Sequence, residues 1–265
     1  FYGFNVLGFP ISEQYRVSSF FGEELKMGSY ISRLLPILIC LFIINRNYFK
    51  AKLIIIFFII IFSFFLILLS GERSALIMSM LIILFSTIYI SKHLKNTYIV
   101  FLFIFFILVI ILTLDPELFK RFVARTLTQF NTYNYIAGEG KLLIFTSHHE
   151  GLYRTAYNIF LDNYLFGIGP KMFRIECALY LKEIYNCSTH PHNYYIQILS
   201  ETGIISFLFF IGIYITLILG FFSLFFKSKA SYFQFFSILS LVVQLLPIIP
   251  TGNFFNNWLS VMLFY

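Results

Sequence analysis

Long uncharged apolar stretches alternate with short polar connections along this chain. Five of them contain no Asp, Glu, Lys or Arg: Leu53–Ser70, Ser74–Ser91, Thr97–Leu114, Thr202–Phe226 and Ala230–Tyr265. A bilayer core about 30 Å thick needs roughly 20 apolar residues per spanning helix. Four stretches match one span each, and the last can hold one full span and the start of another. Met27–Ile44 adds a further span if Arg33 lies near its outer end.

The apolar runs predict helices rather than the strands of a membrane barrel. They are uniform in Ile, Leu and Phe, whereas barrel strands alternate residue by residue. Hydrophobic residues make up 59% of the chain and charged residues 12%, against about a quarter charged in soluble domains. We therefore predict an all-α, polytopic transmembrane helical bundle. The chain starts on Phe1 and stops on Tyr265 inside an apolar run, so we expect a fragment truncated at both ends.

The distribution of Lys and Arg predicts how the bundle is oriented. Three short connections carry basic residues and no acid: Arg46, Lys50 and Lys52; Lys92 and Lys95; Lys227 and Lys229. The positive-inside rule places such connections in the cytoplasm. Alternation then gives an outer segment at 1–26, four spans within 27–114, an outer loop domain at 115–191, and a helix start with further spans at 192–265, the last of them incomplete. The three basic connections carry seven Lys and Arg and no acid, whereas the rest of the chain is close to neutral, so they account for the net charge of +7. Basic residues next to membrane spans favour contact with membrane lipids over nucleic acid.

The long loop is expected to be largely helical. Glu117–Phe130 has apolar residues on one helical stripe and basic residues opposite, which is typical of a helix lying on a membrane surface. Leu152–Phe166 and Lys171–Tyr185 are predicted as two further helices, separated by a Gly-Ile-Gly-Pro turn. Cys177 and Cys187 both fall in this loop; they form either a disulfide, in an oxidising exterior, or two free buried thiols.

Two segments carry the chain's most specific pattern. Arg154–Pro170 contains an arginine followed by an apolar helix and the Gly-Ile-Gly-Pro turn, and His190–Gly203 reads His-Asn-x-x-x-Gln-x-x-x-Glu-x-Gly from its third residue. Together they resemble the O-antigen ligase and polymerase family of bacterial envelope glycosyltransferases, although Tyr-Leu-Phe stands where the family often has Pro-Leu-Leu. The turn at Ser70–Leu76 resembles the Ser-Arg turn of that family, and Arg16–Glu23 resembles its earlier outer loop.

The resemblance implies transfer of a glycan from an undecaprenyl-pyrophosphate carrier to an acceptor hydroxyl at the periplasmic face of the bacterial inner membrane. Arginine forks suit the departing pyrophosphate, and a neutral imidazole suits the incoming hydroxyl. We therefore predict His192 as base and Arg73, Arg154 and Arg16 as pyrophosphate ligands. Supporting candidates are His190, Asn193, Gln197, Glu201, Arg121 and Arg125. The acids are too scattered for a paired-carboxylate metal site, so no metal or other cofactor is expected.

Each candidate also has a plainer interpretation. Arg73 would simply reach the headgroups from a helix end, and Arg121 and Arg125 are expected to face lipid. His190 would only orient the segment before Pro191. Glu201 is either a helix-packing acid or an orienter for an arginine, and Gln197 is undecided. His148 and His149 beside Glu150 suggest a metal site, but adjacent helical positions point apart.

Other functions remain open at this point. A transporter or flippase for a lipid-linked or anionic substrate would place ionisable groups near the bilayer midplane, whereas most candidates here gather at one face. Among enzymes, the acceptor is another repeat unit in a polymerase, a lipid A core sugar in a ligase, or a protein hydroxyl in an oligosaccharyltransferase. We favour ligase or polymerase.

Overall fold

The computed structural model describes residues 4, 17, 19–21, 26–44, 49–92, 98–124, 126–127, 145–180, 186–227 and 231–256. Most of these residues are helical and none forms an extended strand, which confirms the all-α prediction. Arg16 and Arg125 lie outside the described residues.

The helices follow the apolar pattern closely in the first part of the chain. In chain order the elements are η1 (Ser19–Phe21), α1 (Met27–Ile44), α2 (Phe49–Ser70), α3 (Arg73–Ser91), α4 (Tyr98–Leu114), α5 (Pro116–Phe119), η2 (Lys120–Ala124), α7 (Ser147–Asp162), α8 (Phe173–Glu176), η3 (Cys177–Tyr180), α9 (Tyr194–Phe226) and α10 (Tyr232–Gln244). They fall into two compact units. Unit 1 comprises Phe1–Val123 with Leu217–Gln244, and unit 2 comprises Ala124–Thr216 with Leu245–Tyr265.

Among the described residues, three helices are long and apolar enough to cross a membrane: α1, α3 and α9. The pair Ile99–Leu114 and Pro116–Ala124, bent by 106°, adds a fourth if it forms one span. The 13 residues of α10 cover only about 20 Å, less than the full span predicted within Ala230–Tyr265. Pro247 and Pro250 follow closely, and proline both lacks an amide donor and disfavours a helical residue before it.

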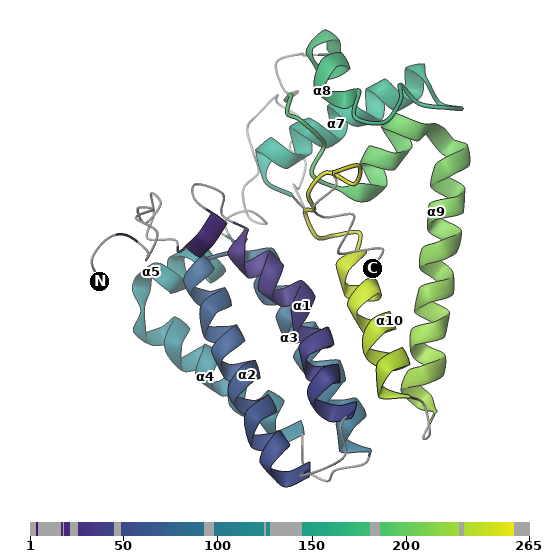
Figure 1. The fold of residues 1–265 in the computed structure, drawn as a ribbon. Helices are drawn as coiled ribbons and strands as arrows, with labels where there is room; N and C mark the ends of the chain where they lie inside the picture. Colours follow the sequence, from purple (N-terminus) through teal and green to yellow (C-terminus); the bar gives the residue numbers. More distant parts are fainter. Residues whose placement is uncertain are drawn as a thin grey trace. The chain divides into compact units, whose positions relative to one another are not determined.

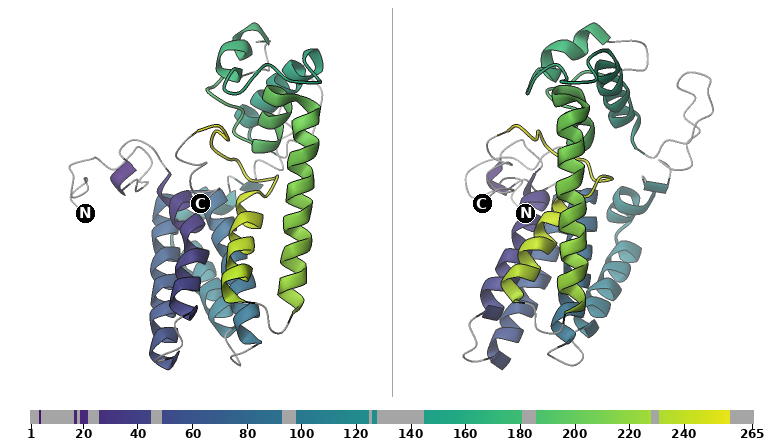
Figure 2. Two further views of the ribbon diagram at one scale, coloured as in Figure 1. Left: turned by 45° about the vertical axis from the view of Figure 1, so that its right-hand side comes forward. Right: turned by 90° about the vertical axis from the view of Figure 1, so that its right-hand side faces the viewer.

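Unit 1 is a helical bundle with α1 at its centre. Helix α1 packs against α2, α3 and α10, and α3 packs against α4 (Figures 1 and 2). Its core includes fully buried Leu35 and Ile83, and the ring of Tyr89 stacks on Phe235 at a centroid distance of 3.7 Å. Large apolar side chains on α4, such as Phe106, stay exposed, as expected of a surface that faces lipid.

The two ends of the unit 1 bundle are distinguished by the connections they carry. Helix ends that flank the three basic connections gather at one end (Figure 1). There the Lys92 ammonium lies 4.8 Å from the centroid of the Phe225 ring. The opposite end carries the α2–α3 turn and the start of α1. The Gly28 amide of α1 donates a hydrogen bond to the Glu72 carboxylate of the turn and so joins the two. We call this the turn end.

The loop helices are shorter than predicted or begin elsewhere. Within the described residues, Glu117–Phe130 forms α5, the π-helical η2 and a helical pair at 126–127. The chain turns sharply after α4, where Asp115 caps α5. Helix α7 begins at Ser147, where Thr146 is the N-cap, and ends at Asp162 rather than Phe166. The predicted helix Lys171–Tyr185 forms only α8 and η3; residues 181–185 lie outside the described part.

Unit 2 has a small apolar core of its own. Leu152, Ala156 and Ile159 of α7 pack against Phe173 and Cys177, and all five side chains are fully buried. This core fixes α7 against α8 and η3. It therefore supports the polar groups at the start of α7 and of α9 that are described next.

Candidate functional site

The Gly-Ile-Gly-Pro turn and the kink in α9 form one close backbone junction. Gly203 has φ 75° and ψ −177°, a conformation that essentially only glycine adopts. A Cβ on Gly203 would lie 2.2 Å from the Leu165 carbonyl oxygen, and a Cβ on Gly167 would lie 2.4 Å from the Glu201 carbonyl carbon. The Gly169 amide donates to the Glu201 carbonyl at 2.8 Å. The glycines of both motif segments therefore allow two backbones to touch.

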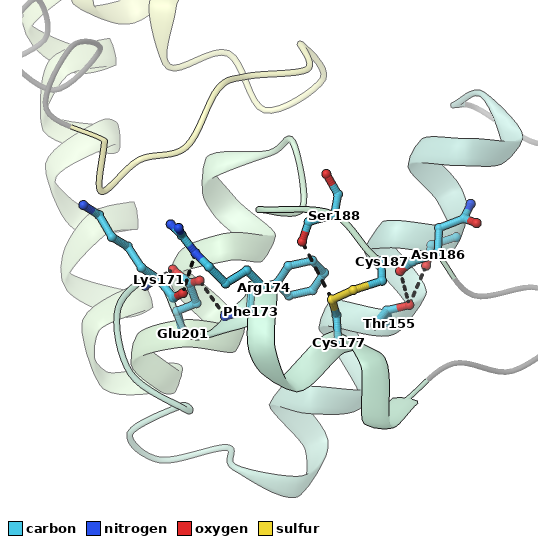
Figure 3. The surroundings of a disulfide bond; sticks show 10 residues. Thr155, Lys171, Phe173, Arg174, Cys177, Asn186, Cys187, Ser188 and Glu201 are labelled. Carbon is cyan, nitrogen blue, oxygen red and sulfur yellow. Dashed lines mark hydrogen bonds between the residues drawn. A yellow bond between two sulfur atoms is a disulfide. The ribbon is translucent and has the colours of Figure 1, made fainter.

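Glu201 acts as a cap for the loop that follows this junction. The side chain is fully buried, and its carboxylate accepts hydrogen bonds from the Lys171 amide at 3.1 Å and the Phe173 amide at 3.0 Å (Figure 3). It also accepts one from Gln197 Nε2 at 2.9 Å. A buried carboxylate is tolerated when it accepts several such bonds. In place of orienting an arginine, Glu201 fixes the first turn of α8.

Gln197 and Asn193 bind the segment after α10. Gln197 donates to Asn253 Oδ1 at 2.8 Å and accepts from the Phe254 amide at 2.9 Å. Asn193 donates to the Pro247 carbonyl at 2.7 Å. These contacts join the 245–256 segment to the start of α9. Asn253 had no signal in the sequence, because its partner lies 56 residues away.

Asn193 also sets where α9 begins. Its side-chain oxygen accepts from the Tyr195 amide at 2.9 Å and the Ile196 amide at 3.3 Å, which is N-cap geometry. The helix consequently starts at Tyr194, whereas the sequence pattern predicted a start at His192. His192 precedes the cap.

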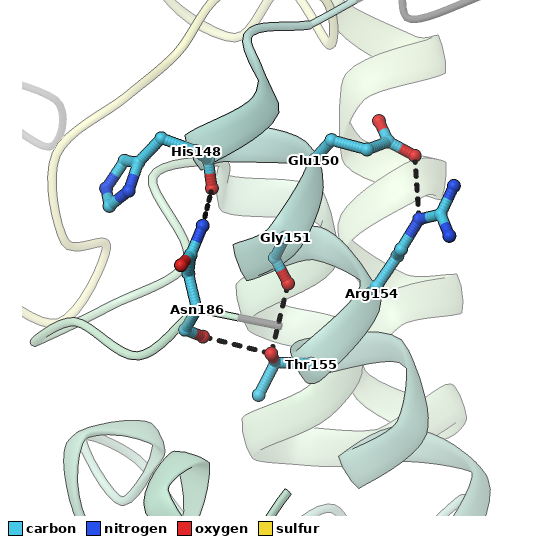
Figure 4. A network of polar contacts seen from close by, with 6 residues as sticks. All are labelled: His148, Glu150, Gly151, Arg154, Thr155 and Asn186. Carbon is cyan, nitrogen blue, oxygen red and sulfur yellow. Dashed lines mark hydrogen bonds and ion pairs between the residues drawn. The ribbon is translucent and has the colours of Figure 1, made fainter. Parts of the chain in front are cut away.

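The segment before His192 is fastened on two sides. Cys177 and Cys187 form a disulfide, with their Cα atoms 5.3 Å apart (Figure 3). Thr155 of α7 donates to the Asn186 carbonyl at 2.9 Å, and Asn186 Nδ2 donates to the His148 carbonyl at 3.2 Å (Figure 4). Residues 186–193 are therefore held to α7 and to the α8–η3 segment together.

His192 lies among other imidazoles in unit 2. It adopts φ 60°, and its carbonyl accepts a hydrogen bond from the Thr251 amide at 2.8 Å. The His192 ring centroid lies 4.0 Å from that of His190 and 5.6 Å from that of His149. His149 belongs to the first turn of α7, and the sequence pattern had connected it only with His148 and Glu150. Within the described chain, no group of three or more His, Cys, Asp or Glu side chains is arranged to hold a metal ion.

Arg154 lines a shallow depression on α7. The depression has a volume of about 370 Å³ and is lined by Glu150, Tyr153, Arg154, Tyr157, Asn158 and Ile196. Arg154 Nε donates to Glu150 Oε1 at 3.3 Å, and His148 points away from this pair (Figure 4). A partly exposed pair four residues apart on a helix contributes about 0.3–0.5 kcal/mol, so a phosphate anion is able to displace it. Burial raises the pKa of Tyr153 to about 12, so its phenol stays neutral.

In unit 1, two arginines border the α2–α3 turn. Arg73 is the first residue of α3 and is half-buried. The Arg121 side chain covers Gly71, because a Cβ added to Gly71 would lie 2.4 Å from Arg121 Nη1. Arg121 was expected to face lipid, and this position differs from that expectation. Positive residues at a helix N-terminus are unfavourable unless an anion is near, because that end already carries partial positive charge. The turn thus brings two arginines beside the N-terminus of α3 and the buried Glu72 carboxylate, and its cations can bind an anion.

Comparison with known proteins gives one family match. The family model described as O-antigen ligase matches residues 58–211, more than half of the chain. No curated protein and no solved structure matches. The matched range includes the α2–α3 turn, α7, the glycine junction and His192.

Proposed function

Because the chain belongs to the O-antigen ligase family, we propose that it transfers a glycan from undecaprenyl pyrophosphate to an acceptor hydroxyl in the synthesis of surface polysaccharide. Family membership implies a membrane enzyme of the glycosyltransferase type. The observation that carries the finer assignment is His192, positioned by a backbone bond from Thr251, with His149 and Arg154 presented by the same helix α7.

His192 is proposed as the general base. The acceptor oxygen attacks the anomeric carbon of the donor sugar, the bond from that carbon to the pyrophosphate oxygen breaks, and the pyrophosphate leaves with the electron pair. The proton of the acceptor hydroxyl passes to the imidazole. Positioned bases of this kind contribute typically 10²–10⁴-fold in rate. His190, whose ring lies 4.0 Å from that of His192, is proposed to orient it.

The arginines are proposed to stabilise the leaving pyrophosphate. Arg73 would act together with the N-terminus of α3, and Arg121 would support it from its position across Gly71. Arg154 would exchange its weak contact with Glu150 for a phosphate oxygen. Arg16 is assigned the same role from the sequence pattern alone. The developing charge is then met by fixed cations, which is the largest single contribution in many enzymes.

The remaining assignments follow from the charge distribution and the family. With the basic connections in the cytoplasm, the active face is periplasmic and the membrane is the bacterial inner membrane. The acceptor is a lipid A core sugar or another repeat unit, with a protein hydroxyl as a third option. No metal or other cofactor is required.

The proposal is tested with purified protein in nanodiscs, lipid-linked glycan donor and acceptor. His192→Ala is expected to lower the transfer rate at least 100-fold while donor binding and the unfolding temperature are kept. His148→Ala is the matched control, because this side chain is exposed and points away from Arg154 (Figure 4). Equal rates for the two variants would remove His192 from the mechanism, and a rate lost to chelator and restored by a divalent ion would contradict the metal-free assignment.

The class of acceptor is identified from the surface polysaccharide of cells that lack the gene. Polymer that accumulates beside uncapped lipid A core indicates a ligase, whereas core capped with single repeat units indicates a polymerase. Donor moved across vesicles without transfer of its glycan would support the flippase instead.

A further inference from the structure

Arg33 is a charged residue in the interior of the unit 1 bundle. It lies in α1, which packs against α2, α3 and α10, and only 8% of its surface is exposed. A buried guanidinium between spanning helices is costly and usually faces the bundle interior for a functional reason. Arg33 does not reach for the headgroups along a lipid-facing surface, because its side chain is covered by protein.

The described residues offer this charge no counter-ion. Arg33 Nε has no hydrogen-bond partner, and no carboxylate in the described chain pairs with the guanidinium. The acid at the turn end, Glu72, accepts instead from the Gly28 amide at 2.7 Å and from the amide and hydroxyl of Ser29. Ser29 is one helical turn before Arg33, so Glu72 satisfies the helix start rather than the arginine.

Neutral polar groups of α10 contact the backbone of α1 at Arg33. Ser240 Oγ donates to the Arg33 carbonyl at 3.5 Å, and Gln244 Nε2 donates to Ser240 Oγ at 2.9 Å. Both side chains are buried. Within the described residues, the polar side chains that α10 brings to Arg33 are uncharged, so an anion that pairs with the guanidinium has to come from elsewhere.

The depth of Arg33 indicates what kind of anion this is. Arg33 lies five residues after Gly28, about 7–8 Å along α1 from the turn end. A phosphate group attached to a lipid chain is held near this depth by its tail, whereas a soluble anion is not. Arginine binds phosphate oxygens in pairs through its planar fork.

We propose that Arg33 binds a phosphate oxygen of the lipid-linked donor, in addition to the arginines at the turn end. This inference rests on the proposed function, since it takes the donor to be a polyprenyl pyrophosphate. An anionic phospholipid offers the same chemistry, and the experiment separates the two sources. No carboxylate of the described residues pairs with Arg33, and the donor pyrophosphate would supply the missing negative charge.

The test measures thermal unfolding of the full chain in detergent with added undecaprenyl pyrophosphate or phosphatidylglycerol. Arg33→Met is expected to unfold at the same or a higher temperature than the wild type without lipid, because an unpaired buried charge is removed. Its affinity for undecaprenyl pyrophosphate is expected to fall at least tenfold. Arg33→Lys keeps the charge and loses the planar fork, so its affinity is expected to lie between those of Arg33→Met and the wild type. Arg174→Met removes an exposed arginine and should bind undecaprenyl pyrophosphate like the wild type.

Three results would overturn the inference. One is equal affinity of Arg33→Met and the wild type for undecaprenyl pyrophosphate, which leaves the proposed function intact. Another is a lower unfolding temperature of Arg33→Met that Glu23→Gln or Glu24→Gln compensates, because Arg33 then pairs with a carboxylate of its own chain. The third is phosphatidylglycerol binding as tightly as undecaprenyl pyrophosphate and lost equally in Arg33→Met, which makes the ligand an ordinary membrane lipid. A wild type that binds no undecaprenyl pyrophosphate contradicts the proposed function itself.

Discussion

Replacing Gly203 with alanine is expected to separate α9 from the loop that precedes α8. The new Cβ would lie 2.2 Å from the Leu165 carbonyl oxygen and 2.5 Å from the Phe166 amide nitrogen. Both neighbours are backbone atoms, which cannot move aside as the end of a flexible side chain would. The two segments must therefore move apart, and the hydrogen bond from the Ile204 amide to the Tyr164 carbonyl at 2.8 Å is lost with them.

The magnitude follows from two contributions. A non-glycine residue at φ 75° and ψ −177° costs about 1–3 kcal/mol in backbone strain. Three backbone hydrogen bonds cross the junction, from Ile168 to Ser200, from Gly169 to Glu201 and from Ile204 to Tyr164, and each contributes about 1 kcal/mol. We expect Gly203→Ala to lower the free energy of unfolding by about 4–6 kcal/mol, which corresponds to an unfolding temperature roughly 10–20 °C lower for a chain of this size.

Gly212→Ala provides the matched control, because it makes the same change in the same helix where nothing lies within 4 Å of the added Cβ. Alanine replaces glycine there in a regular helix, so stability should stay the same or rise by up to about 1 kcal/mol. The measurement is thermal unfolding in detergent, together with the yield of monodisperse protein. If both variants unfold within a degree or two of the wild type, the close backbone junction does not exist as described.

Three further predictions concern unit 2. Reduction of the Cys177–Cys187 disulfide, or Cys187→Ser, should lower the free energy of unfolding by about 2–3 kcal/mol. Reductant should leave the unfolding temperature of Cys187→Ser unchanged. A wild type whose unfolding temperature does not change with reductant would contradict the disulfide. Gln197→Leu leaves Asn253 and the neighbouring amide without their partner and should cost about 2–4 kcal/mol, so a variant as stable as the wild type would refute the role of Gln197 in holding residues 245–256. Tyr153→Phe should leave the pH dependence of transfer unchanged between about pH 6 and 9, because the pKa of Tyr153 is raised to about 12; a displaced alkaline limb would show that the phenol titrates during the reaction.

The membrane helices of the first part of the chain were predictable from its sequence. The bounds Met27–Ile44 agree with α1, and Ser74–Ser91 differs from α3 by one residue. In an apolar environment a helix must satisfy its own backbone groups, so the length of an apolar run decides the length of the helix. The prediction did not extend to α10, where the run continues through Pro247 and the helix ends at Gln244.

The polar contacts of unit 2 depended on information that periodicity does not carry. His149 and His192 come together because α7 begins at Ser147, five residues earlier than the apolar pattern indicated, and because Asn186 ties the later segment to α7. A cap such as Thr146 is visible only once the start of the helix is known. Likewise, the burial of Arg33 depends on α10 packing against α1 from more than 200 residues away.

The pattern that carried the family resemblance is mainly a scaffold. Gln197 and Glu201 use their side chains to hold backbone amides of neighbouring segments, and Gly203 allows those segments to touch. Loss of activity in a Gln197 or Glu201 variant is therefore evidence of catalysis only if the unfolding temperature is unchanged. His192 differs from them, because its contact with Thr251 is made by its backbone carbonyl. Alanine at this position keeps that hydrogen bond and removes the imidazole together with its ring contacts to His190 and His149. His192→Ala therefore reports on chemistry when its unfolding temperature equals that of the wild type.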